Sequence, residues 1–236
     1  REHLSIVTFS LDGATAATHD ALRGQGSFRR VMQAMSICVV KQIPFSINMV
    51  VTAHNCHEIA AISGLAGRWG TRGVRFGHLL PNPTTTAAQF DLTPTQRRAI
   101  EDEIRHLATT AAVPSGLAPG HHTPDLFPCA PLNLQEININ CHGEMTTCCH
   151  LSGHGADVGD GDIVGSLHEH SFGELYTWLV QENQRFRRAK IAHFGQGHNS
   201  PTDNFPCWYC SCAYQKVDWL ATYPEHPWQP NSVANA

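Results

Sequence analysis

The sequence has no long hydrophobic run, few charged residues and no excess of basic ones. A helix needs about 20 consecutive apolar residues to cross a bilayer. No segment approaches that length, so we expect no membrane span. Charged residues make up 15% of the chain and the net charge is -4, which gives no basic surface for nucleic acid. A secretory signal peptide is also missing ahead of the first predicted strand. We therefore expect a cytoplasmic protein with reduced thiols.

The first residue is Arg1 rather than methionine, and it lies directly before a predicted strand. We therefore interpret the chain as a piece of a longer protein, whose earlier part could carry an export signal. Its 236 residues correspond to one large domain or two small ones. That length is enough to bury a hydrophobic core without the help of disulfides.

Strands alternate with helices in the first region. Apolar and β-branched runs predict strands at Ser5–Ser10, Ser46–Val51 and Val74–Leu80. Helices with apolar residues at the 3.6-residue period follow each strand and begin near Ser27, Asn55 and Thr93. This alternation predicts a parallel sheet with right-handed crossovers, and its few units do not close a barrel.

The second region has a different pattern. Proline and glycine concentrate in residues 111–128, which we interpret as a linker between a first domain, 1–110, and a second, 129–236. In the second domain, the alternating segment Leu134–Asn140 predicts a half-exposed strand, Gly143 a hairpin turn and Phe172–Phe186 a helix. We therefore expect a small α+β domain after the α/β domain.

Cysteine distinguishes the second domain. Nine cysteines occur in the chain, and most follow residue 128. Cys129 and Cys148 flank Gly143 at spacings of thirteen and four residues, and Cys207-Trp-Tyr-Cys210-Ser-Cys212 follows later. Thiolates at such spacings hold a metal centre or pair as disulfides. Two pairs of cysteines would also suit zinc, although the first pair lacks the short spacing of a zinc finger.

Several motifs of the first domain resemble one enzyme family. Ser10-Leu-Asp-Gly13, then His19-Asp20-Ala-Leu-Arg23-Gly24 and Gly26-Ser27-Phe28, resembles the fourth strand and following loop of radical S-adenosylmethionine (SAM) enzymes. Phe45–Val51 and Val74–Pro81 resemble that family's fifth and sixth strands, so the resemblance covers residues 5–107. It implies the C-terminal half of a partial (β/α)6 barrel with its site at the C-terminal strand ends, as in other parallel βα folds.

The resemblance also implies which residues bind SAM. Ser10 matches the family's serine that contacts SAM, and Arg23 matches an arginine that helps bind the SAM carboxylate, which a guanidinium fork suits. Asn48 on the next strand is a third candidate. The structural alternatives are a turn residue for Ser10, a surface ion pair for Arg23 and a packing contact for Asn48. No catalytic residue is identified.

One motif of the family is absent. Radical SAM enzymes hold the SAM-binding [4Fe-4S] cluster on a Cys-x3-Cys-x2-Cys loop, and that triplet occurs nowhere in this sequence. The resemblance therefore implies that this cluster belongs to a part of the protein before Arg1. It also implies that this chain alone does not cleave SAM.

The cysteine pattern of the second domain is similar to SPASM and twitch domains, which bind auxiliary clusters in radical SAM enzymes. This similarity implies one auxiliary [4Fe-4S] cluster on four ligands, Cys129, Cys148, Cys207 and Cys210. Cys149 and Cys212 are neighbours that could replace a ligand. A full SPASM domain has further cysteines after the later pair, so we expect one cluster rather than two. Trp208 and Tyr209 would shield it from water.

The remaining cysteines and histidines fit a metal site less well. Cys38 and Cys56 lie on predicted helical segments as buried thiols or incidental residues, and Cys141 at a strand end fits either a ligand or such a role. His150 and His154 lie near Cys148 in sequence and could support a ligand. His168-Glu-His170 fits a surface loop better than a metal site.

With the resemblance, the sequence predicts part of a radical SAM enzyme. Such an enzyme forms a 5′-deoxyadenosyl radical that abstracts hydrogen from a substrate, here a peptide or a cofactor precursor. An electron donor such as flavodoxin or ferredoxin is expected for the family. Two alternatives stay open from the residues alone. One is a non-enzymatic zinc- or Fe-S-binding structural module on an α/β domain, and the other is an α/β binding protein with disulfides.

Overall fold

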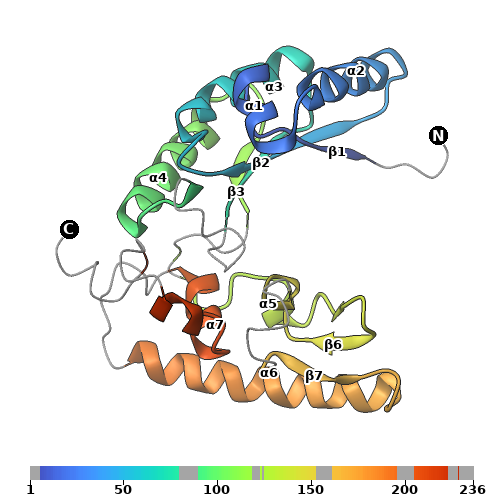
Figure 1. The fold of residues 1–236 in the computed structure, drawn as a ribbon, viewed down its shortest axis with the longest axis vertical. Coiled ribbons are helices and arrows are strands. Elements are labelled where there is room, and N and C mark those ends of the chain that lie inside the picture. The colour runs from blue at the N-terminus through green and yellow to red at the C-terminus, as the bar shows by residue number, and fades with distance from the viewer. Residues whose placement is uncertain are drawn as a thin grey trace. The chain divides into compact units, whose positions relative to one another are not determined.

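The computed structural model describes residues 6–79, 90–118, 123, 125–152, 161–195, 205–222 and 228. The chain divides into two compact units (Figure 1). Unit 1 comprises Arg1–Leu79 with Ala87–Ala118, and unit 2 comprises Leu80–Thr86 with Pro119–Ala236. Among the described residues, no helix combines the length and the apolar character that crossing a bilayer requires.

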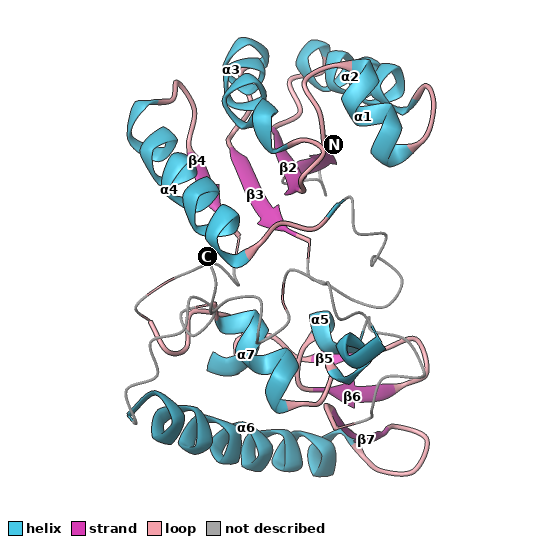
Figure 2. Cartoon of the chain, turned by 60° about the vertical axis from the view of Figure 1, so that its left-hand side comes forward, coloured by secondary structure: helices cyan, strands magenta, loops and turns pink. Residues whose placement is uncertain are grey.

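Unit 1 is a parallel sheet whose strands alternate along the chain with helices (Figure 2). The strands lie in chain order, β1-β2-β3-β4, and each neighbouring pair is parallel. This confirms the predicted α/β class with a parallel sheet. The elements are β1 (Val7–Ser10), α1 (Ala16–Arg23), α2 (Ser27–Val40), β2 (Phe45–Val51), η1 (Cys56–Glu58), α3 (Ile59–Trp69), β3 (Val74–His78), α4 (Pro94–Thr110) and β4 (Ser115–Leu117).

The sheet of unit 1 buries one face and leaves the other polar. Alternate residues of β2, from Phe45 to Val51, are buried, because successive side chains of a strand point to opposite faces. They pack in one core with Met35 of α2, Ile62 of α3 and Ile104 of α4. The opposite face of the sheet carries the more exposed positions Thr8, Ser10, Ser46, Asn48 and Arg75.

Two elements of unit 1 were not predicted from the sequence. Helix α1 begins after Thr15, whose hydroxyl accepts a hydrogen bond from the Thr18 N–H at 3.3 Å. Strand β4 lies inside residues 111–128, the segment that the sequence analysis interprets as a linker. Ser115 pairs with Val74 of β3, and its hydroxyl lies 3.2 Å from that of Ser63. A strand this short carries too little periodicity to stand out among prolines and glycines.

Asn55, near which the sequence predicts the start of a helix, is followed by the 3-10 turn η1 and then by α3, and its side chain makes no capping hydrogen bond. Its side chain is fully buried, and Oδ1 accepts the Thr52 N–H at 2.7 Å. Nδ2 donates to the carbonyls of Asp12, at 2.9 Å, and Val50, at 2.8 Å. Asn55 therefore ties together the segments at the C-terminal ends of β1 and β2.

Unit 2 combines a small antiparallel sheet, in the order β5-β6-β7, with helices. Met145 of β6 packs with Leu175 and Leu179 of the long helix α6. Gly143 turns the β5–β6 hairpin with a φ of 74°, which confirms the predicted turn. The elements are η3 (Pro131–Asn133), β5 (Asn138–Ile139), β6 (Glu144–Thr146), α5 (Cys149–Ser152), β7 (Ile163–Ser166), α6 (Phe172–Gly195), α7 (Pro206–Ala213) and η4 (Asp218–Thr222).

Candidate metal centre

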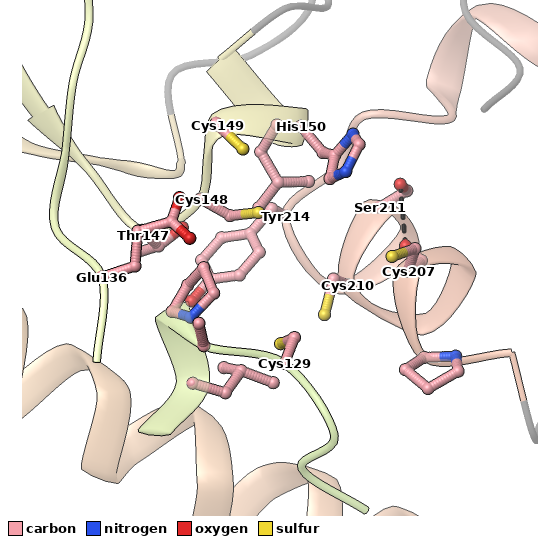
Figure 3. A pocket seen from close by; sticks show the side chains of 15 residues that line it. Cys129, Glu136, Thr147, Cys148, Cys149, His150, Cys207, Cys210, Ser211 and Tyr214 are labelled. Carbon is pink, nitrogen blue, oxygen red and sulfur yellow. Dashed lines mark hydrogen bonds between the residues drawn. The ribbon is translucent and has the colours of Figure 1, made fainter. Parts of the chain in front are cut away.

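A cavity in unit 2 brings the four predicted cysteine ligands together (Figure 3). It holds about 110 Å³ and is lined by Cys129, Cys148, Cys207 and Cys210, together with Cys149. These cysteines come from three separate stretches of the chain: the loop before η3, the segment that runs from the end of β6 into the start of α5, and helix α7. Their grouping therefore follows from the fold and not from proximity in sequence.

Helix α6 fixes the loop that carries Cys129. The Asn133 side chain donates to the carbonyl of Cys129 at 3.1 Å, which closes the loop on itself. Arg187 of α6 donates to the carbonyl of Leu132 at 2.8 Å, and Asn183 donates to that of Pro131 at 3.2 Å. These bonds hold the backbone next to Cys129 in place, so its thiol does not need to be ordered by a ligand.

Helix α7 presents Cys207 and Cys210 together. Residues three positions apart lie on the same face of a helix, and Pro206 at the helix start has its fixed φ suited to that place. Trp208 faces a different hydrophobic group, formed by Phe205, Leu220 and Trp228, against which Cys207 also packs. Tyr209 packs instead with the group that contains Cys210 and Cys148. Trp208 and Tyr209 therefore pack in two different hydrophobic groups, and each group includes cysteines of the site.

A buried ion pair connects α7 with the sheet. Lys216, after α7, places Nζ 2.7 Å from Oδ1 of Asp162, and both side chains are nearly inaccessible. The backbone carbonyl of Asp162 accepts the N–H of Thr147, the residue before Cys148, at 3.0 Å. The pair therefore helps to set the position of Cys148 relative to α7.

Burial keeps the thiols of α7 protonated in the absence of metal. It raises the pKa of Cys207 above its ordinary value and that of Cys210 to about 12. A hydrogen bond with Cys149 raises the pKa of Cys148, and burial adds to the effect, while the same bond lowers the pKa of Cys149. A metal binds the thiolate, so loading this site would release protons.

The cysteines surround the cavity without converging on one point (Figure 3). Within the described part of the chain, no group of three or more His, Cys, Asp or Glu side chains is arranged to hold a single metal ion. The donor set of the cavity is therefore rich in cysteine, but its described members do not form a site for a single ion.

The other sequence candidates lie in different environments. His150 lines the cavity, whereas His154 falls outside the described residues. His168 packs against the turn glycine of the β5–β6 hairpin, and the ring of His170 contacts Trp178 with centroids 4.7 Å apart. Of the remaining cysteines, Cys38 is buried in unit 1, Cys56 is half-buried there, and Cys141 and Cys212 are exposed.

The three predicted SAM-binding residues lie in unit 1. Ser10 of β1 and Asn48 of β2 are direct partners in the parallel register, so they share the polar face of the sheet. The guanidinium of Arg23 pairs with the carboxylate of Asp12, which also accepts the Val50 N–H at 2.8 Å. Arg23 thus forms an ion pair, which is the role that the sequence analysis gave as the alternative to SAM binding. Whether these three residues bind SAM stays a prediction.

The structure adds residues that the sequence reasoning missed. Arg75 of β3 is the register partner of Asn48, and both line a hollow of about 530 Å³ over the polar face. The signal available in the sequence was a charged residue between Val74 and Phe76, two apolar residues that are buried in the strand. In unit 2, Tyr214 lines the cysteine cavity, and its hydroxyl donates to Glu182 of α6 at 3.1 Å. No pattern in the sequence linked those two residues.

Comparison with known proteins gives relatives for part of the chain. No protein-family model matches it. Mycofactocin maturase MftC from Mycobacterium tuberculosis is 33% identical over 96 residues, which are 40% of this chain and 24% of that protein. AdoMet-dependent heme synthase from Methanosarcina barkeri is 34% identical over 76 residues, 32% of this chain and 22% of that protein. The match thus spans about a quarter of the length of these relatives.

Among solved structures, anSMEcpe with bound AdoMet superposes with a TM-score of 0.49 at 14% identity. The superposition covers 72% of this chain and 48% of that one. A structure of native anSMEcpe with AdoMet and a peptide gives a TM-score of 0.46 at 14% identity, with 72% and 50% covered. The sequence relatives confirm the resemblance that the motifs of the first domain predicted: this chain is related to radical SAM enzymes.

Proposed function

We propose that this chain is part of a radical SAM enzyme and that unit 2 holds one auxiliary [4Fe-4S] cluster on Cys129, Cys148, Cys207 and Cys210. One observation carries the proposal: these four thiols, from three distant segments, line a single cavity. Four cysteine thiolates complete the ligand set of such a cluster. The relationship to radical SAM enzymes makes an iron–sulfur group the natural occupant.

The arrangement of the thiols favours a cluster over zinc. A cubane cluster separates its four thiolate ligands because each binds a different iron, whereas zinc draws all four to one atom. The described cysteines border a cavity and offer no site for a single ion. The raised pKa values of Cys207 and Cys210 are no obstacle, because loading releases the protons.

The surrounding residues would exclude water from the cluster. Phe186 of α6 stacks on Tyr214 with ring centroids 5.2 Å apart, and Tyr209 meets the edge of the same phenylalanine at 5.8 Å. Rings at these positions form an apolar wall that Leu132 and Leu151 extend. When bound, an auxiliary cluster supplies a site for one electron or an anchor for the substrate.

The complete enzyme would act on a peptide or a cofactor precursor after SAM cleavage in the barrel. One relative is named as a maturase and another as a heme synthase, and heme is a cofactor. SAM would lie on the polar face of the unit 1 sheet, where Ser10 and Asn48 are aligned. We also propose that an electron donor such as flavodoxin or ferredoxin reduces the enzyme.

Metal analysis of the anaerobically purified chain tests the cluster. We expect iron and acid-labile sulfide in equal amounts, and single Ala replacements of Cys129, Cys207 or Cys210 should leave iron substoichiometric. Cys38→Ala, in unit 1, is the matched control and should retain the metal. Zinc in place of iron would favour the structural-module alternative. Full iron in every ligand variant would refute the cluster.

The choice between Cys148 and Cys149 needs its own comparison, because the two are adjacent and both line the cavity. Cys148 is half-buried and Cys149 is exposed, so we assign the ligand to Cys148. Cys148→Ala should lose iron while Cys149→Ala keeps it. The reverse result would move the ligand by one residue and leave the cluster itself in place.

A further inference from the structure

A buried lysine lies one turn after Phe186, the residue of α6 that packs with Cys129, Cys148 and Cys210. The buried positions of this helix are Leu175, Leu179, Asn183, Phe186 and Lys190, so the lysine continues an otherwise largely apolar stripe. Lys190 is only 1% exposed. Its Nζ has no hydrogen-bond partner among the residues that the structure describes. An ammonium in such a place requires compensation, since burial of an unpaired charge is costly.

Aromatic rings supply part of that compensation. Nζ of Lys190 lies 5.6 Å from the ring centroid of Phe127, 5.9 Å from that of Phe194 and 5.5 Å from that of Tyr209. The faces of aromatic rings attract cations at these distances. Tyr209 lies between Cys207 and Cys210 in sequence, so the ring contact brings the ammonium to the helix that carries two of the proposed ligands.

Once they bind metal as thiolates, the cysteines would be the negative groups that act on this ammonium. Burial lowers the pKa of Lys190, whereas charge on Cys210, Cys129 and Cys207 would raise it. All three are proposed cluster ligands. A [4Fe-4S] cluster with four thiolates has a net charge of roughly -2 when oxidised and -3 when reduced. A positive charge on Lys190 therefore stabilises the reduced form more than the oxidised form.

We propose that Lys190 is the charge partner of the auxiliary cluster and sets its reduction potential from the α6 side. This inference rests on the cluster proposed above. Lys190 acts as a positioning charge and not as a ligand, because lysine nitrogen is not among the ordinary ligands of iron–sulfur clusters. Its positive charge favours the addition of an electron to the cluster. This agrees with a cluster that accepts one electron.

The test is a redox titration of the anaerobically purified chain, followed by electron paramagnetic resonance of the reduced cluster. At a fixed potential, Lys190→Met should lower the ratio of reduced to oxidised cluster at least tenfold, a shift of about 59 mV for one electron. Arg188→Met is the matched control, because it removes a positive charge from an exposed position of the same helix. We expect that control to leave the potential unchanged.

Each result decides the inference. An unchanged potential in Lys190→Met, with full iron content, overturns it. If that variant loses its iron, Lys190→Arg decides instead: it preserves the charge and should retain both iron and potential. Loss of iron from Lys190→Arg as well would show a purely structural role and also overturn the inference. Absence of iron and sulfide from the wild-type chain would overturn the proposed cluster, which is a distinguishable outcome.

Discussion

Removal of one member of the Asp162–Lys216 ion pair should destabilise unit 2 more than removal of both. The Asp162 and Lys216 side chains are 1% and 5% exposed, so Lys216→Met leaves a buried carboxylate without its countercharge. Breaking a buried pair in this way costs about 3–5 kcal/mol. Asp162→Leu combined with Lys216→Met removes both charges, and such replacements are neutral or stabilising by about 1–4 kcal/mol. Oδ2 of Asp162 has no hydrogen-bond partner among the described residues, which favours the apolar pair.

Thermal unfolding at one scan rate, followed by tryptophan fluorescence, measures the difference. Four of the five tryptophans, at 178, 208, 219 and 228, belong to unit 2, so the signal reports mainly on that unit. For a unit of this size, a loss of about 3–5 kcal/mol lowers the apparent midpoint by roughly 10–20 °C. The double variant should unfold within a few degrees of the wild type or above it. A double variant as unstable as Lys216→Met would refute the charge argument and assign the loss to packing.

Further predictions concern both units. Thr93→Ala removes a capping box with Gln96 and should cost about 1 kcal/mol in the opening of α4, measured by hydrogen exchange, whereas the exposed Thr95→Ala should not. Gly143→Ala should cost unit 2 about 1–2 kcal/mol in thermal unfolding, because φ is 74° and the new Cβ would lie 3.0 Å from the His168 ring. Burial lowers the pKa of His19 from 6.5, so the stability that neutral His19 gives is full above pH 6.5 and decreases as the pH falls below it. Hydrogen exchange of α1 at pH 7.5 and 5.5 measures this, and equal protection would contradict it. Chelation of iron should expose unit 2 to proteases before unit 1, because metal binding there contributes folding free energy; equal cleavage of both units would contradict this.

The sequence predicted those parts of the fold in which a strong local signal agrees with the tertiary structure. The threonine–proline start of α4 and the glycine of the β5–β6 hairpin are examples, since cap and turn chemistry depend on few neighbours. Strand β4 and helix α1 were missed. The strand is three residues long, and α1 depends on Glu58, which accepts hydrogen bonds from Ala14 and Thr18 across the fold. Such long-range contacts produce no periodic pattern in the sequence.

For the candidate site, the resemblance to SPASM and twitch domains identified four of the five cysteines that line the cavity, but not Tyr214 or the buried Lys190. The predicted helix ended at Phe186, whereas α6 continues to Gly195. Extension of the stripe of Leu175, Leu179 and Phe186 by one turn would have placed Lys190 in the core. The lysine was missed because charged residues are rarely fully buried, so a pattern of apolar positions stops at them.

The order in which the chain is synthesised has a consequence for how the cysteine cavity is assembled. Cys207 follows Cys148 by 59 residues, and α6 lies between them. At about 5–20 residues per second, a ribosome needs roughly 3–12 s to make that stretch. During this interval Cys129 and Cys148 already exist while Cys207 and Cys210, the two proposed ligands of α7, are still to be made. Iron delivered then would meet half of the proposed ligand set, and oxygen would meet unprotected thiols. Assembly in the cell should therefore depend on when iron and sulfur arrive as well as on how much is present.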